Sequence, residues 1–301
     1  MSINDMKSKI VVLLLIFCWI PSFCGCTKKV QNHSSNIVRI GTFNIAWLGD
    51  GINDKILRSE HDYKNIADVI QQADADILGI EEIENQVAFA RILKYLPGYK
   101  FYVGTHGGSQ NIGVIYREDI SVKYDQEYMQ IAVDFHKTRP GLVLSCRKGN
   151  FDWKMMVVHL KSSSSHDSTA KMQADARQTR IIQAEICSQW VDSTLKSSDE
   201  KDIFIVGDFN DFPKRKINPT LTSLVVNSEL EFLTFESKSC KNDQWSGIDH
   251  IVCSKSAKKR FITGSDHSIN FYAEMTKNEA DKVSDHCPVL VDFDISAPDN
   301  D

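Results

Sequence analysis

The most constraining feature of this chain is an alternation of strand-length apolar segments with segments of helical periodicity, which begins at residue 38. The segment 38–47 (VRIGTFNIAW) reads as an apolar strand, and apolar side chains at 63, 66, 67 and 70 mark one face of a helix. Further strands are predicted at 76–83, 99–103, 112–116, 141–147, 153–160, 202–207, 247–253 and 287–293, and further helices at 86–95 and 169–195. No repeat or linker divides residues 38–296, so the pattern predicts one α/β domain whose sheets are covered by helices.

Two local details of this pattern can be checked against a structure. The strands 141–147 and 153–160 are expected to form a hairpin about Lys148-Gly149-Asn150. The core face of the long helix is expected to consist of Ala174, Ile181, Ile182, Ile186, Trp190 and Val191.

The N-terminus carries an export signal. Lys7 and Lys9 precede an apolar run at 10–20 that is too short to span a bilayer comfortably. Gly25-Cys26 resembles a bacterial lipoprotein box, in which Cys26 is lipidated and becomes the new N-terminus; ordinary cleavage and an uncleaved anchor are the alternatives. Residues 1–26 are therefore read as signal peptide and lipobox, 27–37 as a tether and 297–301 as a tail. The protein is expected to be an exported bacterial protein, either a cell-envelope lipoprotein or secreted.

Charge and cysteine content exclude several classes of site. The formal net charge of −5 leaves no overall basic field for nucleic acid, so a phosphate-handling site needs local positive charge or a metal ion. No closely spaced cysteine pair remains after residue 26, which excludes a zinc ribbon and a CxxC redox motif. Outside the cytoplasm a disulfide is allowed, but its pairing does not follow from the sequence, and most cysteines are expected in the core.

Polar residues recur where the predicted strands end or begin. They are Asn44, Glu81, Glu82, His159, Asp208, Asn210, Asp249, Asp285 and His286. One such residue is commonly a cap or a surface group. Here these nine residues belong to six different strand ends, and all are Asn, Asp, Glu or His, which indicates a shared site. Oxygen ligands with His and without Cys suit Mg²⁺, or Mn²⁺ and Ca²⁺, better than structural zinc.

The chain resembles the endonuclease/exonuclease/phosphatase superfamily, whose DNase I-like members share its motifs. These motifs are GTFN, IEE, VHLKS, GDFND, IDHIVCS and SDHCPVLVDF, and they occur in the family's order across residues 38–294. The resemblance implies a four-layer, two-sheet α/β sandwich and divalent-metal-dependent hydrolysis of a phosphoester bond.

The resemblance also implies a role for each site residue. It places Asn44, Glu82 and Asp285 at the metal site. It makes Asp208 the water-activating or phosphate-proximal carboxylate and Asn210 a transition-state hydrogen-bond donor. It makes His286 the catalytic histidine, oriented by Asp249, and His159 a second active-site histidine. Because adjacent residues of a strand face opposite ways, only one of Glu81 and Glu82 can point into the site, and the motif favours Glu82.

The expected function is that of an exported phosphodiesterase, namely a nuclease that acts on nucleic acid. One alternative is a phospholipid phosphodiesterase of the sphingomyelinase type, and another is a non-catalytic surface binding protein on the same fold. A lipid anchor would bring the protein to a membrane. No protein partner is inferred, and a monomer is expected.

Overall fold

The computed structural model describes residues 36–301 except 135–136, 164–166 and 300. The predicted signal peptide, the lipobox with Cys26 and nearly all of the tether lie outside the described residues. Within the described part of the chain, no helix is long and apolar enough to cross a membrane.

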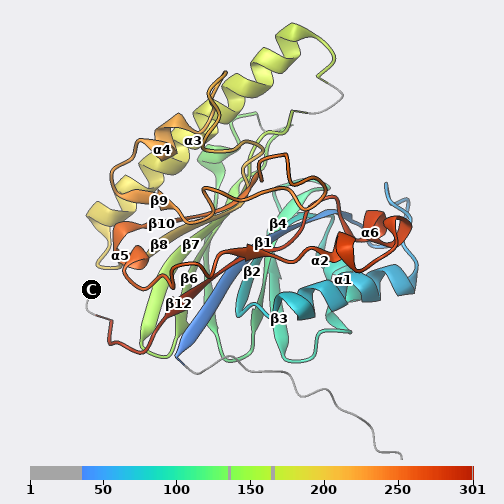
Figure 1. The fold of residues 1–301 in the computed structure, drawn as a ribbon, viewed down its shortest axis with the longest axis horizontal. Coiled ribbons are helices and arrows are strands. Elements are labelled where there is room, and N and C mark those ends of the chain that lie inside the picture. Colours follow the sequence, from blue (N-terminus) through green and yellow to red (C-terminus); the bar gives the residue numbers. More distant parts are fainter. Residues whose placement is uncertain (1–35, 135–136, 164–166, 300) are drawn as a thin grey trace, which may run out of the picture. The chain divides into compact units, whose positions relative to one another are not determined.

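Two six-stranded mixed sheets pack face to face (Figure 1). The first has the order β11-β12-β1-β2-β4-β3 and the second the order β5-β6-β7-β8-β10-β9. The strands of the first sheet are β1 (Ile37–Leu48), β2 (Ile77–Ile83), β3 (Tyr99–Val103), β4 (Asn111–Arg117), β11 (His267–Ser268) and β12 (Val289–Asp294). Those of the second are β5 (Ser121–Tyr128), β6 (Gly141–Lys148), β7 (Phe151–His159), β8 (Ile203–Asp208), β9 (Leu230–Phe232) and β10 (Asp249–Ser254).

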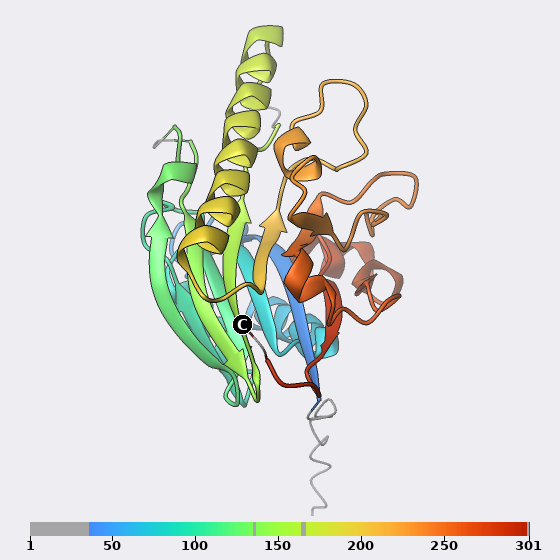
Figure 2. The same ribbon diagram turned by 90° about the vertical axis from the view of Figure 1, so that its left-hand side faces the viewer.

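Helices cover the outer face of each sheet, which gives four layers (Figure 2). One apolar cluster fills the space between the sheets, a second lies under α1 and α2, and a third lies under α3. The helices are α1 (Glu60–Ala73), α2 (Gln86–Leu93), α3 (Ala170–Ser197), α4 (Thr222–Val225), α5 (Lys255–Lys258) and α6 (Lys277–Val283), with 3₁₀ turns η1 (Met129–Ile131) and η2 (Phe271–Ala273). The predicted two-sheet α/β sandwich is confirmed.

The core face of α3 differs from the expectation. Trp190 and Val191 are buried as predicted, whereas Ala174 and Ile182 are exposed and Ile181 and Ile186 are only partly buried. The polar side chains of Arg180 and Gln183 are buried instead. Both buried polar side chains are satisfied by hydrogen bonds: Arg180 Nε donates to Thr220 Oγ1 (2.8 Å), and Gln183 Nε2 donates to the main-chain oxygen of Ile131 (3.0 Å). Apolar periodicity could not find this face, because hydrogen bonds allow polar groups to be buried.

The predicted hairpin is confirmed as β6 and β7, which pair from Leu142 opposite Val157 to Lys148 opposite Phe151. Among the residues that the structure describes, a disulfide joins Cys240 to Cys287, and Cys146, Cys187 and Cys253 are free and buried in the core.

Candidate active site

Strand pairing brings the predicted polar residues of the second sheet to one edge. His159 ends β7 and lies opposite Asp208, which ends the parallel neighbour β8. Asp249 begins the antiparallel strand β10 and also lies opposite Asp208. Because parallel strands end at the same edge of a sheet, these three side chains come together through the backbone alone.

Close packing of the strands depends on Gly207. Its φ of +145° disfavours residues with a side chain, and a Cβ atom at this position would lie 1.9 Å from the main-chain oxygen of Val158. Only glycine fits between β7 and β8 here, so Gly207 allows Asp208 and His159 to sit side by side.

Asp208 lies at the centre of the site. Its Oδ2 atom is 3.1 Å from Asn44 Nδ2, 3.5 Å from His159 Nε2 and 3.9 Å from His286 Nε2. Its Oδ1 atom accepts a hydrogen bond from the main-chain N–H of Asn210 (2.8 Å). Side chains from both sheets therefore converge on one buried carboxylate.

Burial raises the pKa of Asp208 to about 7, and the nearby Asp249 charge acts in the same direction. Positively charged His286 and the hydrogen bonds to Asp208 oppose this rise in pKa. A carboxyl group with such a pKa changes protonation near neutral pH, which suits a base that accepts a proton from water.

His286 is held by Asp249. Its Nδ1 atom lies 3.0 and 2.9 Å from the two carboxylate oxygens of Asp249. Burial lowers the pKa of His286, but the charges of Asp249 and Asp208 outweigh burial and raise that pKa well above its usual value. The ring is therefore an imidazolium, whose Nε2–H points towards the space beside Asp208.

Ser284 fixes the segment that carries His286. Its hydroxyl donates to the main-chain oxygen of Asn44 (2.6 Å) and accepts from the main-chain N–H of His286 (3.0 Å). Because Ser284 is fully buried, these two hydrogen bonds hold Asn44 of β1 close to the loop that carries His286. The sequence reading gave Ser284 no role, although it is part of the SDHCP motif.

Glu81 and Glu82 point in different directions. Glu82 has a left-handed backbone (φ +64°) at a register shift of β2, and its Oε1 atom lies 3.3 Å from Asn44 Nδ2 and 3.8 Å from His159 Nε2. Glu81 is fully buried and accepts a hydrogen bond from Thr42 Oγ1 (2.7 Å). Burial raises the pKa of Glu81 well above its usual value, which favours the neutral form of this side chain beneath the site.

His159 and Arg139 complete the inner side of the site. Burial lowers the pKa of His159 well below its usual value, and the charge of Arg139 adds to this effect, so His159 is neutral. The Arg139 guanidinium donates to Gln110 Oε1 (2.9 Å) and to the main-chain oxygen of His159 (3.4 Å). The charges of Glu82 and Asp208 partly offset the effect of burial on the pKa of Arg139, which places this cation beside the carboxylates.

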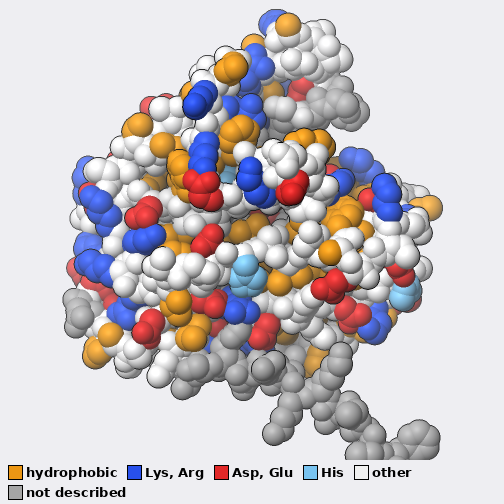
Figure 3. All heavy atoms as spheres, viewed as in Figure 1, with side chains coloured by type: hydrophobic (Ala, Val, Ile, Leu, Met, Phe, Trp, Pro, Cys, Tyr) orange, Lys and Arg blue, Asp and Glu red, His pale blue; other side chains and the backbone are white. Residues whose placement is uncertain are grey.

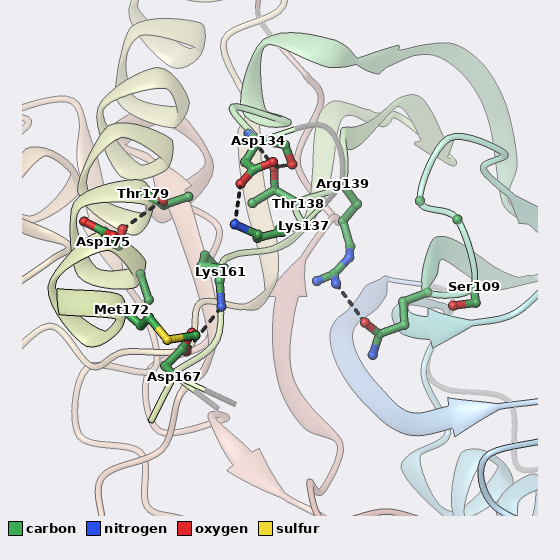
Figure 4. Close-up of a pocket in the computed structure, with 14 residues that line it drawn as sticks. Ser109, Asp134, Lys137, Thr138, Arg139, Lys161, Asp167, Met172, Asp175 and Thr179 are labelled. Atoms are coloured by element: carbon green, nitrogen blue, oxygen red, sulfur yellow. Dashed lines mark hydrogen bonds and ion pairs between the residues drawn. The ribbon is translucent and has the colours of Figure 1, made fainter. Parts of the chain in front are cut away.

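A cavity of about 550 Å³ opens on the Arg139 side (Figure 4). Its charged side chains are mostly paired, since Lys137 lies 3.3 Å from Asp134 and Lys161 lies 3.5 Å from Asp167. Described residues from four segments line it: Gly107, Gly108, Ser109, Gln110, Asp134, Lys137, Thr138, Arg139, Lys161, Asp167, Met172, Asp175, Ala176 and Thr179. The cavity therefore offers mainly polar groups to a ligand that reaches Arg139.

Two predicted site residues have different surroundings from the rest. Asn210 has a left-handed backbone (φ +51°), and its side-chain amide donates to the main-chain oxygen of Leu160 (3.0 Å). The Asp285 side chain is 61% exposed, and its Oδ1 atom lies 3.9 Å from His286 Nε2. The structure thus brings Asn44, Glu82, His159, Asp208, Asn210, Asp249 and His286 together and leaves Asp285 at the rim.

The donor set fits a hard divalent cation. Glu82 and Asp208 both approach the Asn44 amide, and ligand atoms of Asp208, Asp249 and His286 lie within 4.8 Å of one another. No cysteine takes part, and carboxylate oxygens are the ligands that Mg²⁺ and Mn²⁺ prefer.

Comparison with known proteins agrees with this geometry. Residues 41–286 match the model of the Endonuclease/Exonuclease/phosphatase family. A search of curated proteins finds no match.

Solved structures with the same fold cover most of this chain. TDP2 from C. elegans is 19% identical with a TM-score of 0.61, over 86% of this chain and 75% of that one. A mannosyl-6-phosphatase from Bacteroides thetaiotaomicron is 16% identical with a TM-score of 0.58, over 84% and 98%. The catalytic domain of human Nocturnin with bound sulfate is 15% identical with a TM-score of 0.59, over 86% and 94%.

Proteins of this family are typically metal-dependent hydrolases of phosphoester bonds, which matches the buried carboxylate and the paired histidine found here. The family match covers most of the chain, and the solved structures share its two-sheet fold. This chain belongs to the endonuclease/exonuclease/phosphatase family.

Proposed function

We propose that this protein is an exported, divalent-cation-dependent phosphodiesterase that cleaves nucleic acid. The observation that carries the proposal is the convergence of His159, Asp208 and the Asp249–His286 pair on one point. This arrangement places a group able to accept a proton next to a group able to donate one, as hydrolysis of a phosphodiester requires.

Each residue has a defined task in this proposal. Asp208, whose pKa burial raises to about 7, accepts the proton of the attacking water. The His286 imidazolium donates a proton to the leaving oxygen of the phosphodiester. Asp249 maintains the charge and the orientation of the His286 ring. Neutral His159 and the Arg139 cation stabilise the negative charge that develops on the phosphate oxygens.

A bound Mg²⁺ would be held at Glu82 and Asn44, with Asp285 as a further predicted ligand, and Mn²⁺ or Ca²⁺ could replace it. When bound, the cation neutralises charge on the phosphate oxygens. The closeness of Glu82 and Asp208 to the same amide nitrogen supports a cation at this place, since two carboxylates otherwise repel each other.

Local cations support an extended polyanionic substrate. Arg139 lies on one side of the site, and Lys238 and Lys241 line a second cavity next to His286. Figure 3 shows Lys and Arg side chains, with Asp and Glu side chains among them, on the upper part of the face seen in that view. These local positive charges can attract a polyanion even though the net charge of the chain is −5.

A substrate panel tests the proposal. Plasmid DNA, sphingomyelin vesicles and mannose 6-phosphate are each incubated with Mg²⁺ and with EDTA. We expect Mg²⁺-dependent nicking of DNA, and His286→Ala and Asp208→Ala to slow it by about 10²- to 10⁴-fold with an unchanged circular dichroism spectrum. Release of choline phosphate without nicking would favour the phospholipid alternative, and inertness of the folded protein towards all three would favour the binding protein.

Export and lipid anchoring through Cys26 are a separate part of the proposal. The Cys240–Cys287 disulfide supports it, because disulfides persist mainly in oxidising compartments. We expect cells that express the full chain to incorporate labelled palmitate into the protein and cells that express Cys26→Ala not to do so. Absence of label from the wild-type protein in the membrane fraction would refute the anchor.

A further inference from the structure

The segment 237–247, between β9 and β10, forms a small hairpin beside the active site, here named the Trp245 hairpin. Main-chain N–H groups of Gly247 and Ser239 donate to the main-chain oxygens of Ser237 (2.9 Å) and Trp245 (3.0 Å), respectively. A side chain on Gly247 would collide with Ser237, since a Cβ atom would lie 2.4 Å from its Oγ atom. The hairpin is therefore ordered by its own backbone.

The disulfide attaches this hairpin to the catalytic segment. Cys240 lies in the hairpin and Cys287 directly follows His286, so a covalent bond joins two places 47 residues apart in sequence. A bond at this position limits how far the hairpin can move away from the His286 ring.

A cavity of about 260 Å³ lies between the hairpin and the site. Trp245, Lys238 and Lys241 line it from the hairpin side, and Asp249 and His286 line it from the site. The Trp245 side chain is 59% exposed, although exposing so large an apolar surface to water is unfavourable. Trp245, two lysines and the His286 ring thus line one space.

We propose that the Trp245 hairpin is a subsite for a nucleobase, which stacks on Trp245 while the adjoining phosphate lies at His286, and that the disulfide holds Trp245 in position. The inference rests on the proposed function and names the part of the substrate that the cavity accepts. Aromatic side chains flanked by basic groups bind single-stranded nucleotides, because every base offers a π-face and every linkage a negative charge.

The chemistry of the cavity favours a nucleotide over the other phosphoesters. The headgroup and acyl chains of a phospholipid offer no ring to stack on an indole. A sugar phosphate offers the charge for Lys238 and Lys241 but not the planar base. Preference for a base-bearing ligand is therefore the property that distinguishes this subsite.

Isothermal titration calorimetry with thymidine 5′-monophosphate and 2-deoxyribose 5-phosphate, both in Mg²⁺, tests the subsite. These probes share the sugar and phosphate and differ only in the base. We expect the wild-type protein to bind the nucleotide about 5- to 100-fold more tightly. Trp245→Ala should abolish this preference without weakening deoxyribose phosphate binding, Trp245→Phe should retain most of it, and Gln244→Ala, an exposed neighbour in the same hairpin, should retain all of it.

The disulfide is tested with Cys240→Ser and with reduced wild-type protein, at temperatures where both remain folded. Cys240 acts through Trp245, so its loss should reduce the preference for the nucleotide and leave the affinity for deoxyribose phosphate unchanged. Loss of affinity for both probes alike would instead indicate a general structural role and overturn the assignment to positioning.

The outcomes separate this inference from the proposed function. Equal affinity for the two probes, or an undiminished preference in Trp245→Ala, would overturn the subsite even if the protein nicks DNA. A nucleotide preference that depends on Trp245 in a protein without phosphoesterase activity would uphold the subsite and refute the proposed function.

Discussion

Replacing Asp249 by Asn tests how the site maintains a charged histidine. Both carboxylate oxygens of Asp249 lie within 3.0 Å of His286 Nδ1, whereas an Asn side chain offers one acceptor oxygen and no charge. Loss of a charge-assisted hydrogen bond costs about 1.5–3 kcal/mol, which corresponds to roughly 10- to 150-fold in rate. Loss of proton donation by His286 adds to this cost, so we expect turnover to fall by about 10²- to 10⁴-fold.

The direction of the pKa change provides a second measurement. Asp249 raises the pKa of His286, so Asp249→Asn should lower it and leave the ring neutral at a pH where the wild-type ring is charged. Titration of the imidazole by NMR in EDTA measures this pKa without a bound metal ion. Turnover assays of the variant at several pH values show the accompanying loss of activity.

A matched control uses Ser265-Asp266-His267, which repeats the Ser-Asp-His sequence found at 284–286. Asp266 is exposed and outside the active site, so Asp266→Asn should leave turnover and the His286 pKa unchanged. If Asp249→Asn folds and retains turnover within tenfold of the wild type, or leaves the pKa of His286 unaltered, the role assigned to Asp249 is wrong.

Three further predictions concern the metal, the backbone and acid stability. Glu82→Gln should weaken Mg²⁺ binding at least about tenfold in calorimetry, and an unchanged affinity would exclude Glu82 as a ligand. Gly207→Ala should lower the free energy of unfolding by about 3 kcal/mol or more, because a Cβ atom would overlap a main-chain oxygen; wild-type stability in urea would contradict this. Burial lowers the pKa of His250 to about 4, so folding favours its neutral form, and about 3 kcal/mol of stability present above pH 6.5 should be lost as the pH falls to 4. In the His250→Gln variant, the free energy of unfolding measured in urea should no longer show this loss between pH 6.5 and 4. If the variant shows the same loss as the wild type, His250 is not its cause.

Much of the fold follows from local sequence patterns. Alternation and turn residues located the hairpin of β6 and β7, because strand pairing there depends on neighbouring segments. The predicted core face of α3 was wrong at Ala174 and Ile182, which are exposed. It also missed the buried Arg180, whose side chain is hydrogen-bonded to Thr220, 40 residues away. Such long-range hydrogen bonds leave no periodic signal in the helix itself.

Parts of the site could not be predicted for a similar reason. Arg139 follows an irregular segment and belongs to no motif, and only the fold places it beside His159. Nothing in cysteine spacing indicates that Cys240 pairs with Cys287, because that pairing depends on how two loops meet. Strand ends, by contrast, are set by local pattern and by sheet topology, so Asp208 and its neighbours could be proposed from the sequence.

The central claim is that a divalent cation binds at Glu82 and Asn44, beside Asp208, at the point where we propose that phosphodiester hydrolysis takes place. Anomalous diffraction from crystals soaked in Mn²⁺ tests this claim most directly. We predict one strong peak in contact with a Glu82 carboxylate oxygen and beside Asp208. A peak confined to the separate acidic group formed by Asp50, Asp54 and Glu84, with none at Glu82, would contradict the account.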